Sequence, residues 1–228
     1  GLLLLGSLIY GFTAMNVLLI AATIGSIKLV GSISWEWNLD LVTAGLLLST
    51  GYAGMFIGAL SCGVLTDHIG RRKTLLLTVS MMSVFTGLCS VASDVLSMAV
   101  LRFVAGIGLG GSLPQPGVYI SEYVPAKYRG RFLGLVETSW VYGALLALLF
   151  PYFLIPAYGW RLTFLVALIP LLLIPIVVSF APESLRYLQL KGKTSEAVIL
   201  LKRYGLVPSD FNERSLPNIA SKRYNVLE

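Results

Sequence analysis

A few charged and aromatic side chains stand inside long apolar stretches, where a polar group needs a reason. Glu137 is one of them, and surroundings without water favour the neutral form of a carboxyl group, which suits proton binding and release. Trp140 lies one turn further along and offers a flat face to a planar or sugar-like solute. Structural roles stay open for both: Glu137 as partner of a basic residue, and Trp140 as packing against lipid or core.

A second chemical candidate is Arg102, which begins the glycine-rich stretch 102–111. The glycines superficially match a dinucleotide fingerprint, but that motif needs a preceding strand and a soluble βαβ unit, and the sequence has neither. They instead predict a flat helix face for close packing. A charge inside a membrane span usually faces a cavity or a partner; the alternative is that Arg102 reaches out to the membrane interface.

The composition indicates that lipid is the solvent for most of these side chains. The chain has 228 residues, of which 56% are hydrophobic and 12% charged, whereas soluble domains are about a quarter charged. A bilayer core is crossed by about 20 apolar residues of helix, which satisfies its own backbone hydrogen bonds. Six such segments are predicted: 2–27, 41–65, 74–93, 95–119, 131–155 and 160–181.

The basic residues fall on one side of this six-span arrangement. They occupy the turn 66–73, the loop 120–131 and the chain after the sixth span, while the opposite side holds only Lys28 and Arg161. Positively charged loops stay in the cytoplasm, so both termini are predicted to be cytoplasmic. The same asymmetry explains the net charge of +6 without nucleic acid. Three tryptophans in the opposite loops suit an interface belt: Trp35, Trp37 and Trp160.

Nothing in the sequence indicates a cofactor, a metal site or catalysis. Cys62 and Cys89 both lie in apolar stretches and are interpreted as small buried hydrophobes. The one histidine, His68, is not in a span, and no H-E-x-x-H motif or paired intramembrane aspartates occur. An intramembrane enzyme is therefore excluded.

The turn after the second span is read as G-V-L-T-D-H-I-G-R-R-K, residues 63–73. Gly63 is predicted to let two helices approach closely, and Gly70 to allow a tight turn. Asp67 can pair with Arg71 or face the positive N-terminus of another helix. The alternative is a basic loop at the membrane edge, placed by topology alone.

Two further motifs lie on the same side. Residues 121–131 put Glu122 within reach of Arg131 or Arg71, and Glu183 with Arg186 can bridge to the basic loops. A solvated loop or a helix cap are the simpler alternatives. We predict a cytoplasmic gating network of these residues: Gly63, Asp67, Gly70, Arg71, Arg72, Glu122, Arg129, Arg131, Glu183 and Arg186.

These motifs together resemble the N-terminal half of the major facilitator superfamily over nearly all of residues 1–205. The turn at 63–73 is similar to the family signature G-x-L-a-D-r-x-G-R-r, and P-E-S-L-R at 182–186 resembles the P-E-S-x-R motif of sugar-porter-like members. Glu137 with Trp140 looks most like the branch of synaptic-vesicle-related transporters and bacterial nicotinate or aromatic-acid porters. The resemblance implies an all-α six-helix half over 1–181, then a cytoplasmic linker with a short amphipathic helix over 182–228.

The resemblance also implies a function: secondary transport of a small organic solute by alternating access across the plasma membrane, with the basic loops locking two halves in one state. Helices one, four and five would line the path, with four residues facing it. The expected partners are the solute, with or without protons, the lipid bilayer, and a second six-helix half from the same polypeptide or a second copy. The four expected path residues are Asn16, Arg102, Glu137 and Trp140.

One departure from the family pattern concerns the first span. The branch often carries F-D-x-M-D, whereas this chain has Phe12-Thr13-Ala14-Met15-Asn16. Thr13 and Asn16 can hydrogen-bond a solute but cannot carry a proton. Glu137 is then the main candidate for proton coupling, and facilitated diffusion is an open alternative. A receptor or scaffold that keeps a transporter fold without transporting is the competing function.

Overall fold

The computed structural model describes residues 2–25, 30–124 and 126–180, and positions 183, 184, 187, 188, 191, 195, 196, 198 and 199. Among these residues the regular structure is helical, without a strand. Six stretches are long and apolar enough to cross a membrane, which confirms the six-span prediction. They are Leu3–Ile24, Leu41–Ile69, Arg71–Val91, Val95–Tyr119, Lys127–Tyr158 and Trp160–Ser179.

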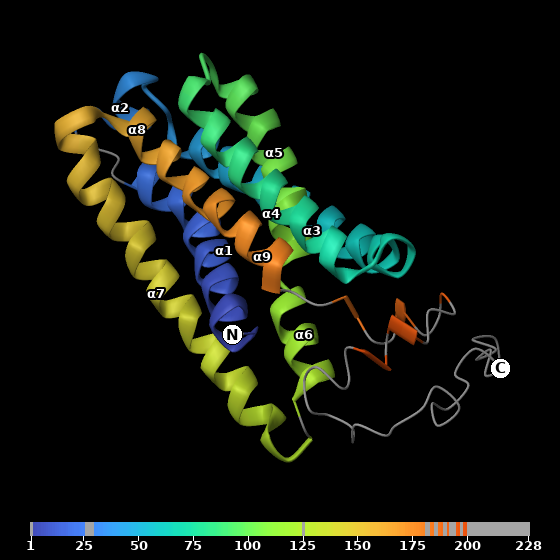
Figure 1. The fold of residues 1–228 in the computed structure, drawn as a ribbon. Coiled ribbons are helices and arrows are strands. Elements are labelled where there is room, and N and C mark those ends of the chain that lie inside the picture. Colours follow the sequence, from blue (N-terminus) through green and yellow to red (C-terminus); the bar gives the residue numbers. More distant parts are fainter. Residues whose placement is uncertain are drawn as a thin grey trace.

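The described residues form eleven helical elements, shown in Figure 1, of which all but the short α2 belong to the spans. The elements are α1 (Leu2–Gly25), α2 (Ile33–Glu36), α3 (Leu41–Ile69), α4 (Arg71–Leu88), η1 (Cys89–Val91), α5 (Val95–Ser112), α6 (Gln115–Tyr123), α7 (Ala126–Tyr158), α8 (Trp160–Leu165), η2 (Val166–Leu173) and α9 (Ile174–Phe180).

Local chemistry fixes where the helices begin. Asp40 caps α3 by accepting a hydrogen bond from the backbone N–H of Thr43 at 3.2 Å. Asp94 caps α5 by accepting from the backbone N–H of Ser97 at 2.6 Å, and the Ser97 side chain returns a bond to the Asp94 backbone. Such caps satisfy N–H groups that a helix start leaves without partners. Gly70, at φ +94°, forms the tight turn between α3 and α4, as predicted.

Glycines set the closest helix contacts, and those of the stretch 102–111 do so as predicted: a Cβ atom at Gly110 of α5 would lie 2.0 Å from the carbonyl oxygen of Met55 in α3. A Cβ atom at Gly54 or Gly58 of α3 would lie 2.1 Å from the carbonyl oxygen of Phe103 or Ile107 in α5, so no side chain fits there. The prediction that Gly63 brings two helices together is wrong for this chain, because a Cβ atom there would meet nothing within 4 Å. Gly63 therefore lies on an open face of α3.

Prolines interrupt two of the predicted spans. The span 95–119 breaks between α5 and α6 at Leu113 and Pro114, and the span 160–181 contains the 3₁₀ segment η2 around Pro170. Proline lacks the N–H group that would donate to the preceding turn, so the α-helical ladder is broken there. The break at Pro114 helps to shape the cavity described below.

Helix packing is uneven around the bundle. α3 and α4 both pack on α5, while α1 packs along α7 (Figure 1). The spans of α3 and α7 are the least buried of the six, and both carry large exposed apolar side chains such as Phe56 and Tyr152. An apolar surface of this kind needs lipid or another protein segment to cover it.

Candidate functional site

The candidate site begins where α1 and α7 cross. A Cβ atom at Gly143 would lie 1.9 Å from the carbonyl oxygen of Gly11, and one at Gly11 would lie 3.1 Å from the carbonyl oxygen of Ser139. The two backbones therefore touch, which small residues permit between membrane helices. Because the two helices touch here, side chains of α1 and α7 lie next to one another on both sides of the crossing.

An open cavity of about 760 Å³ lies on one side of this crossing. It is bounded by α1 and α7 on one hand and by α3, the end of α5 and Pro114 on the other. Its polar groups come from α1 and α7, and the rest of its lining is apolar or small. The lining residues are Tyr10, Ala59, Gly110, Leu113, Pro114, Glu137 and Trp140.

Three of these side chains form a connected group. The Tyr10 hydroxyl donates a hydrogen bond to Glu137 Oε2 at 2.7 Å. The Tyr10 ring lies 5.4 Å from the Trp140 ring between centroids, tilted by 53°. Glu137 is exposed to the cavity and Trp140 is partly buried. The group combines a carboxylate with two aromatic faces, which suits a small planar or ring-shaped solute that also carries hydrogen-bonding groups.

Asn16, expected beside this path, does not line the cavity. Asn16 is fully buried, and its Nδ2 donates to the Phe12 carbonyl at 2.9 Å. Thr13, one turn earlier, is also buried, 3.3 Å from Ser112 Oγ. The two neutral residues that replace the family's acids thus face the interior of the half. The reason is helix phase: each three-residue step turns a side chain by about 60° around the helix axis, so Asn16 points about 120° away from Tyr10.

Arg102 also lies away from the cavity. Its side chain is only 2% exposed, so the alternative that it reaches out to the membrane interface is wrong. The guanidinium sits beside Gly51 of α3, where a Cβ atom would be 3.7 Å from Nη2. Its Nε and Nη1 atoms have no hydrogen-bond partner among the described residues. A buried cation without a partner is costly, so this arginine marks a place where a counter-charge is missing.

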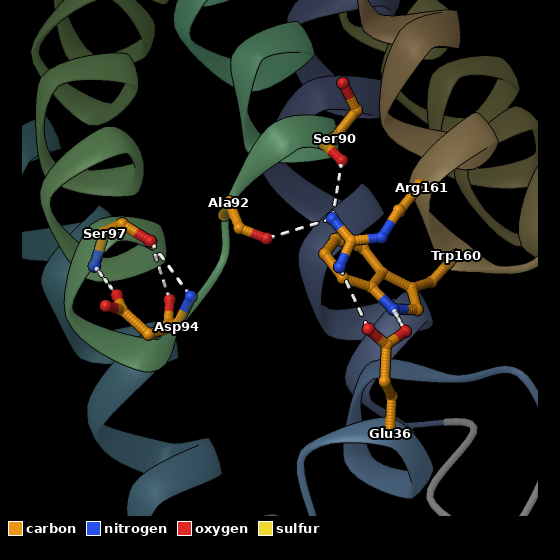
Figure 2. Close-up of polar contacts among 7 residues, drawn as sticks. All are labelled: Glu36, Ser90, Ala92, Asp94, Ser97, Trp160 and Arg161. Atoms are coloured by element: carbon orange, nitrogen blue, oxygen red, sulfur yellow. Dashed lines mark hydrogen bonds and ion pairs between the residues drawn. The ribbon is translucent and has the colours of Figure 1, made fainter.

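Polar residues from the loops near the C-terminal end of α1 form a cluster that we call the clasp (Figure 2). The clasp consists of Glu36, Ser90, Ala92, Trp160 and Arg161. Arg161 pairs with Glu36 Oε1 at 2.9 Å and donates to the carbonyls of Ser90 and Ala92 at 3.1 and 3.0 Å. Trp160 donates its indole N–H to Glu36 Oε2 at 2.6 Å. The clasp joins three loops of the bundle.

The clasp corrects the expectation for two of the loop tryptophans. Trp160 is 1% exposed and packs edge-on against Trp37 and Phe164, so it belongs to the core and not to an interface belt. Trp37 is also packed against this core, whereas Trp35 is 58% exposed. Partial burial opposes ionisation of Glu36, but the bonds from Trp160 and Arg161 outweigh it and lower the pKa of this carboxyl.

We call the other end of the bundle, formed by the turn at Gly70 and the start of α7, the basic end. Some of the residues predicted to form the gating network contact one another there. Glu183 Oε1 accepts a hydrogen bond from the backbone N–H of Arg72 at 3.2 Å, and a Cβ atom at Gly70 would lie 2.7 Å from Glu183 Oε2. The Arg72 guanidinium donates to the Val178 carbonyl. The segment after α9 is thus tied to the first turn of α4.

Three of the other predicted gating residues, Asp67, Arg129 and Arg131, have no hydrogen bond or ion pair to Glu183 or Arg72 in the described part of the chain. Asp67 is exposed and makes no hydrogen bond or ion pair with a described residue, and Arg129 and Arg131 are exposed at the start of α7. The Glu122 side chain and Arg186 lie outside the described residues, as does most of the predicted linker 182–228. The gating role of the whole set stays a prediction.

Comparison with known proteins decides the family. Residues 4–222 match the model of the sugar (and other) transporter family. The chain belongs to that family. The proton:xylose symporter XylE, described as a major facilitator superfamily protein, has the same fold with a TM-score of 0.75 at 24% identity, over 89% of this chain and 49% of that one.

Curated relatives of the family come from bacteria and animals. The niacin transporter NiaP of Acinetobacter baylyi is 37% identical over 76% of this chain and 40% of its own length. The 4-hydroxybenzoate transporter PcaK of the same organism is 33% identical over 73% of this chain and 37% of its own. The synaptic vesicle 2-related protein of Bos taurus is 32% identical over 74% and 30%. The chain therefore spans less than half the length of these relatives.

Sequence reasoning missed Tyr10, which supplies half of the polar contact in the cavity of this family member. A signal was present, because aromatic residues of membrane helices gather at the interfaces, whereas Tyr10 lies in the interior of the span Leu3–Ile24. A tyrosine at that depth needs a hydrogen-bond partner for its hydroxyl. Glu36 was missed as well, since its partners lie 124 and 125 residues away in the chain.

Proposed function

We propose that this chain is the N-terminal half of a secondary transporter that moves a small organic solute by alternating access. The observation that carries the proposal is the open cavity in which Glu137 accepts a hydrogen bond from Tyr10 beside Trp140. Relatives support the proposal, because a niacin transporter and a 4-hydroxybenzoate transporter are 37% and 33% identical to this chain over the aligned residues. A planar solute with an acidic group fits two aromatic faces, and a protonated Glu137 would donate a hydrogen bond to that group.

Glu137 is the proposed proton-coupling residue. It lies ten residues inside the span that begins at Lys127, and its described partner is the Tyr10 hydroxyl. Protonation removes the negative charge and one strong acceptor from that contact, which changes how Tyr10 and Trp140 present their rings to a solute. Thr13 and Asn16 cannot replace this function, because both are neutral and buried.

Arg102 is proposed to act with the second half or with the solute. Two of its nitrogens are buried and have no partner in the described part of this chain. An acid from the second half, or an anionic group of the solute, would supply the missing counter-charge if the helices rearrange to open a path to this buried side chain. Asn16 is proposed to join the path only if the helices rearrange, since its Oδ1 is buried and has no described partner.

The second half is proposed to belong to the same polypeptide. Relatives of which this chain spans 40% and 38% leave room for another six helices, and the exposed apolar face of α3 needs a cover. We further propose that the basic end is cytoplasmic, that residues 182–228 connect the halves, and that the protein lies in the plasma membrane. The intact mass of the native gene product and labelling of cysteines in the clasp loops on whole cells test these points.

Uptake by the full native protein in proteoliposomes tests the function, with radiolabelled niacin, 4-hydroxybenzoate and xylose as probes. We expect uptake of at least one of them, driven by an inward proton gradient, and loss of that drive in Glu137→Gln. Glu196→Gln, an exposed acid outside the spans, is the matched control. No uptake of any solute and no solute binding would favour the receptor or scaffold alternative.

A further inference from the structure

A second groove runs along the α1–α7 pair on the side away from the cavity. Its volume is about 360 Å³ and its walls are mainly apolar. Thr138 lines this groove whereas its neighbour Glu137 lines the cavity, because successive residues of an α-helix point about 100° apart. The walls include Leu4 and Leu8 of α1 and Leu135 and Tyr142 of α7.

The floor of the groove is the helix crossing itself. Gly11 and Gly143 belong to its lining, and the two backbones touch there. A narrow channel with a backbone floor and leucine walls matches a flexible hydrocarbon chain better than a compact polar solute. Tyr142 is 68% exposed on its rim, so the groove opens to the surroundings of the half.

Two positive charges lie on α7 between the groove and the basic end. Arg131 lies four residues before Leu135 in α7, and Lys127 lies four residues before Arg131, so all three share one helix face. Both basic side chains are exposed, and Lys127 is where the span begins. The one acid of α7 is Glu137, on the other side of the helix.

From this arrangement we propose a lipid site: an anionic phospholipid places an acyl chain in the α1–α7 groove and its phosphate on Lys127 and Arg131. The charges lie at the level where a span meets the headgroup region, and cytoplasmic leaflets are rich in anionic lipid. The second half is a less suitable occupant, because it must cover the cavity on the other side of α7. The site differs from the solute cavity, but it rests on the proposed arrangement in which the basic end is cytoplasmic and the second half covers the cavity.

Native mass spectrometry of the full protein in neutral detergent tests the site, with phosphatidylglycerol and phosphatidylcholine of identical chains as probes. We expect tighter retention of phosphatidylglycerol, weakened about fivefold for each charge removed in Lys127→Gln and Arg131→Gln. Arg129→Gln is the matched control, since it is equally exposed but two residues away and on the opposite face of α7. Thr138→Trp fills the groove and should displace the bound lipid.

Three results would overturn the proposal. Equal weakening by Arg129→Gln would reduce the effect to net charge, and unchanged retention in Thr138→Trp would separate the lipid from the groove. Cross-linking of the second half to a cysteine at Thr138 would show that protein, not lipid, covers the groove. Unchanged thermal unfolding of the Arg131→Gln and Arg129→Gln variants confirms that both compare folded protein.

Discussion

The clasp and the cavity lie in the same six-helix half, but the charged groups of the clasp are paired with each other whereas the charged group of the cavity is exposed. In the clasp, Glu36 pairs with Arg161 and also accepts a hydrogen bond from the indole N–H of Trp160. Arg161 donates in addition to the backbone carbonyls of two loop residues, Ser90 and Ala92. In the cavity, Glu137 is exposed and holds Tyr10. One region is complete within this chain, and the other presents groups to something that enters or binds later. The half is therefore tied together by its own side chains where its loops meet and open to other groups along α1 and α7.

The largest test of this contrast uses two glycines of α3. Gly58→Ala would place a methyl group 2.1 Å from the Ile107 carbonyl oxygen, whereas Gly63→Ala would meet nothing within 4 Å. We expect Gly58→Ala to destabilise the fold by about 1–3 kcal/mol or to abolish folded yield, and Gly63→Ala to melt like the wild type. Thermal unfolding of the full protein in detergent measures both. Equal melting of the two variants would contradict the packing of α3 on α5.

The clasp itself is tested by Arg161→Gln. Loss of its ion pair and of two carbonyl contacts should lower stability by about 1–2 kcal/mol, a modest amount because the pair is partly exposed. Arg129→Gln removes the same charge from an exposed position and should leave the melting temperature unchanged. A melting curve of Arg161→Gln that overlays the wild type would show that the clasp does not hold the loops together.

Water access separates the cavity from the interior. After replacement of Cys62 and Cys89 by alanine, a cysteine at Trp140 should react quickly with a charged, water-soluble thiol reagent. A cysteine at Asn16 should react slowly, since that side chain is fully buried. Rapid modification of both positions would mean that the helices open further and that Asn16 joins the path.

The smallest expected effect concerns pH. The bonds from Trp160 and Arg161 hold the pKa of Glu36 below its ordinary value of 4.5, so the clasp contributes stability above that value and loses it as pH falls through the lower folded pKa. Melting temperatures measured from about pH 6 to about pH 3 should therefore fall more for the wild type than for Glu36→Gln. Parallel curves would show that Glu36 titrates alike in the folded and unfolded protein.

The sequence could predict the six spans because hydropathy and length report directly on crossing a membrane. It could not tell which face of a helix points inward, and the misplaced residues follow from that. Asn16 and Arg102 are polar residues in spans but lie buried, while Tyr10 lines the cavity. Gly63 and Gly58 differ only in which neighbour α3 meets at each level. Which face of a helix points inward depends on contacts between segments that are far apart in the sequence.

The central claim, that Glu137 faces a solute path, is tested most directly by gradient-driven uptake in proteoliposomes of the full native protein. We expect Glu137→Gln to lose uptake driven by a proton gradient and Glu196→Gln to keep it, with both variants folded and inserted equally. Proton-driven uptake that is unchanged in Glu137→Gln would remove Glu137 from coupling and from the proposed path.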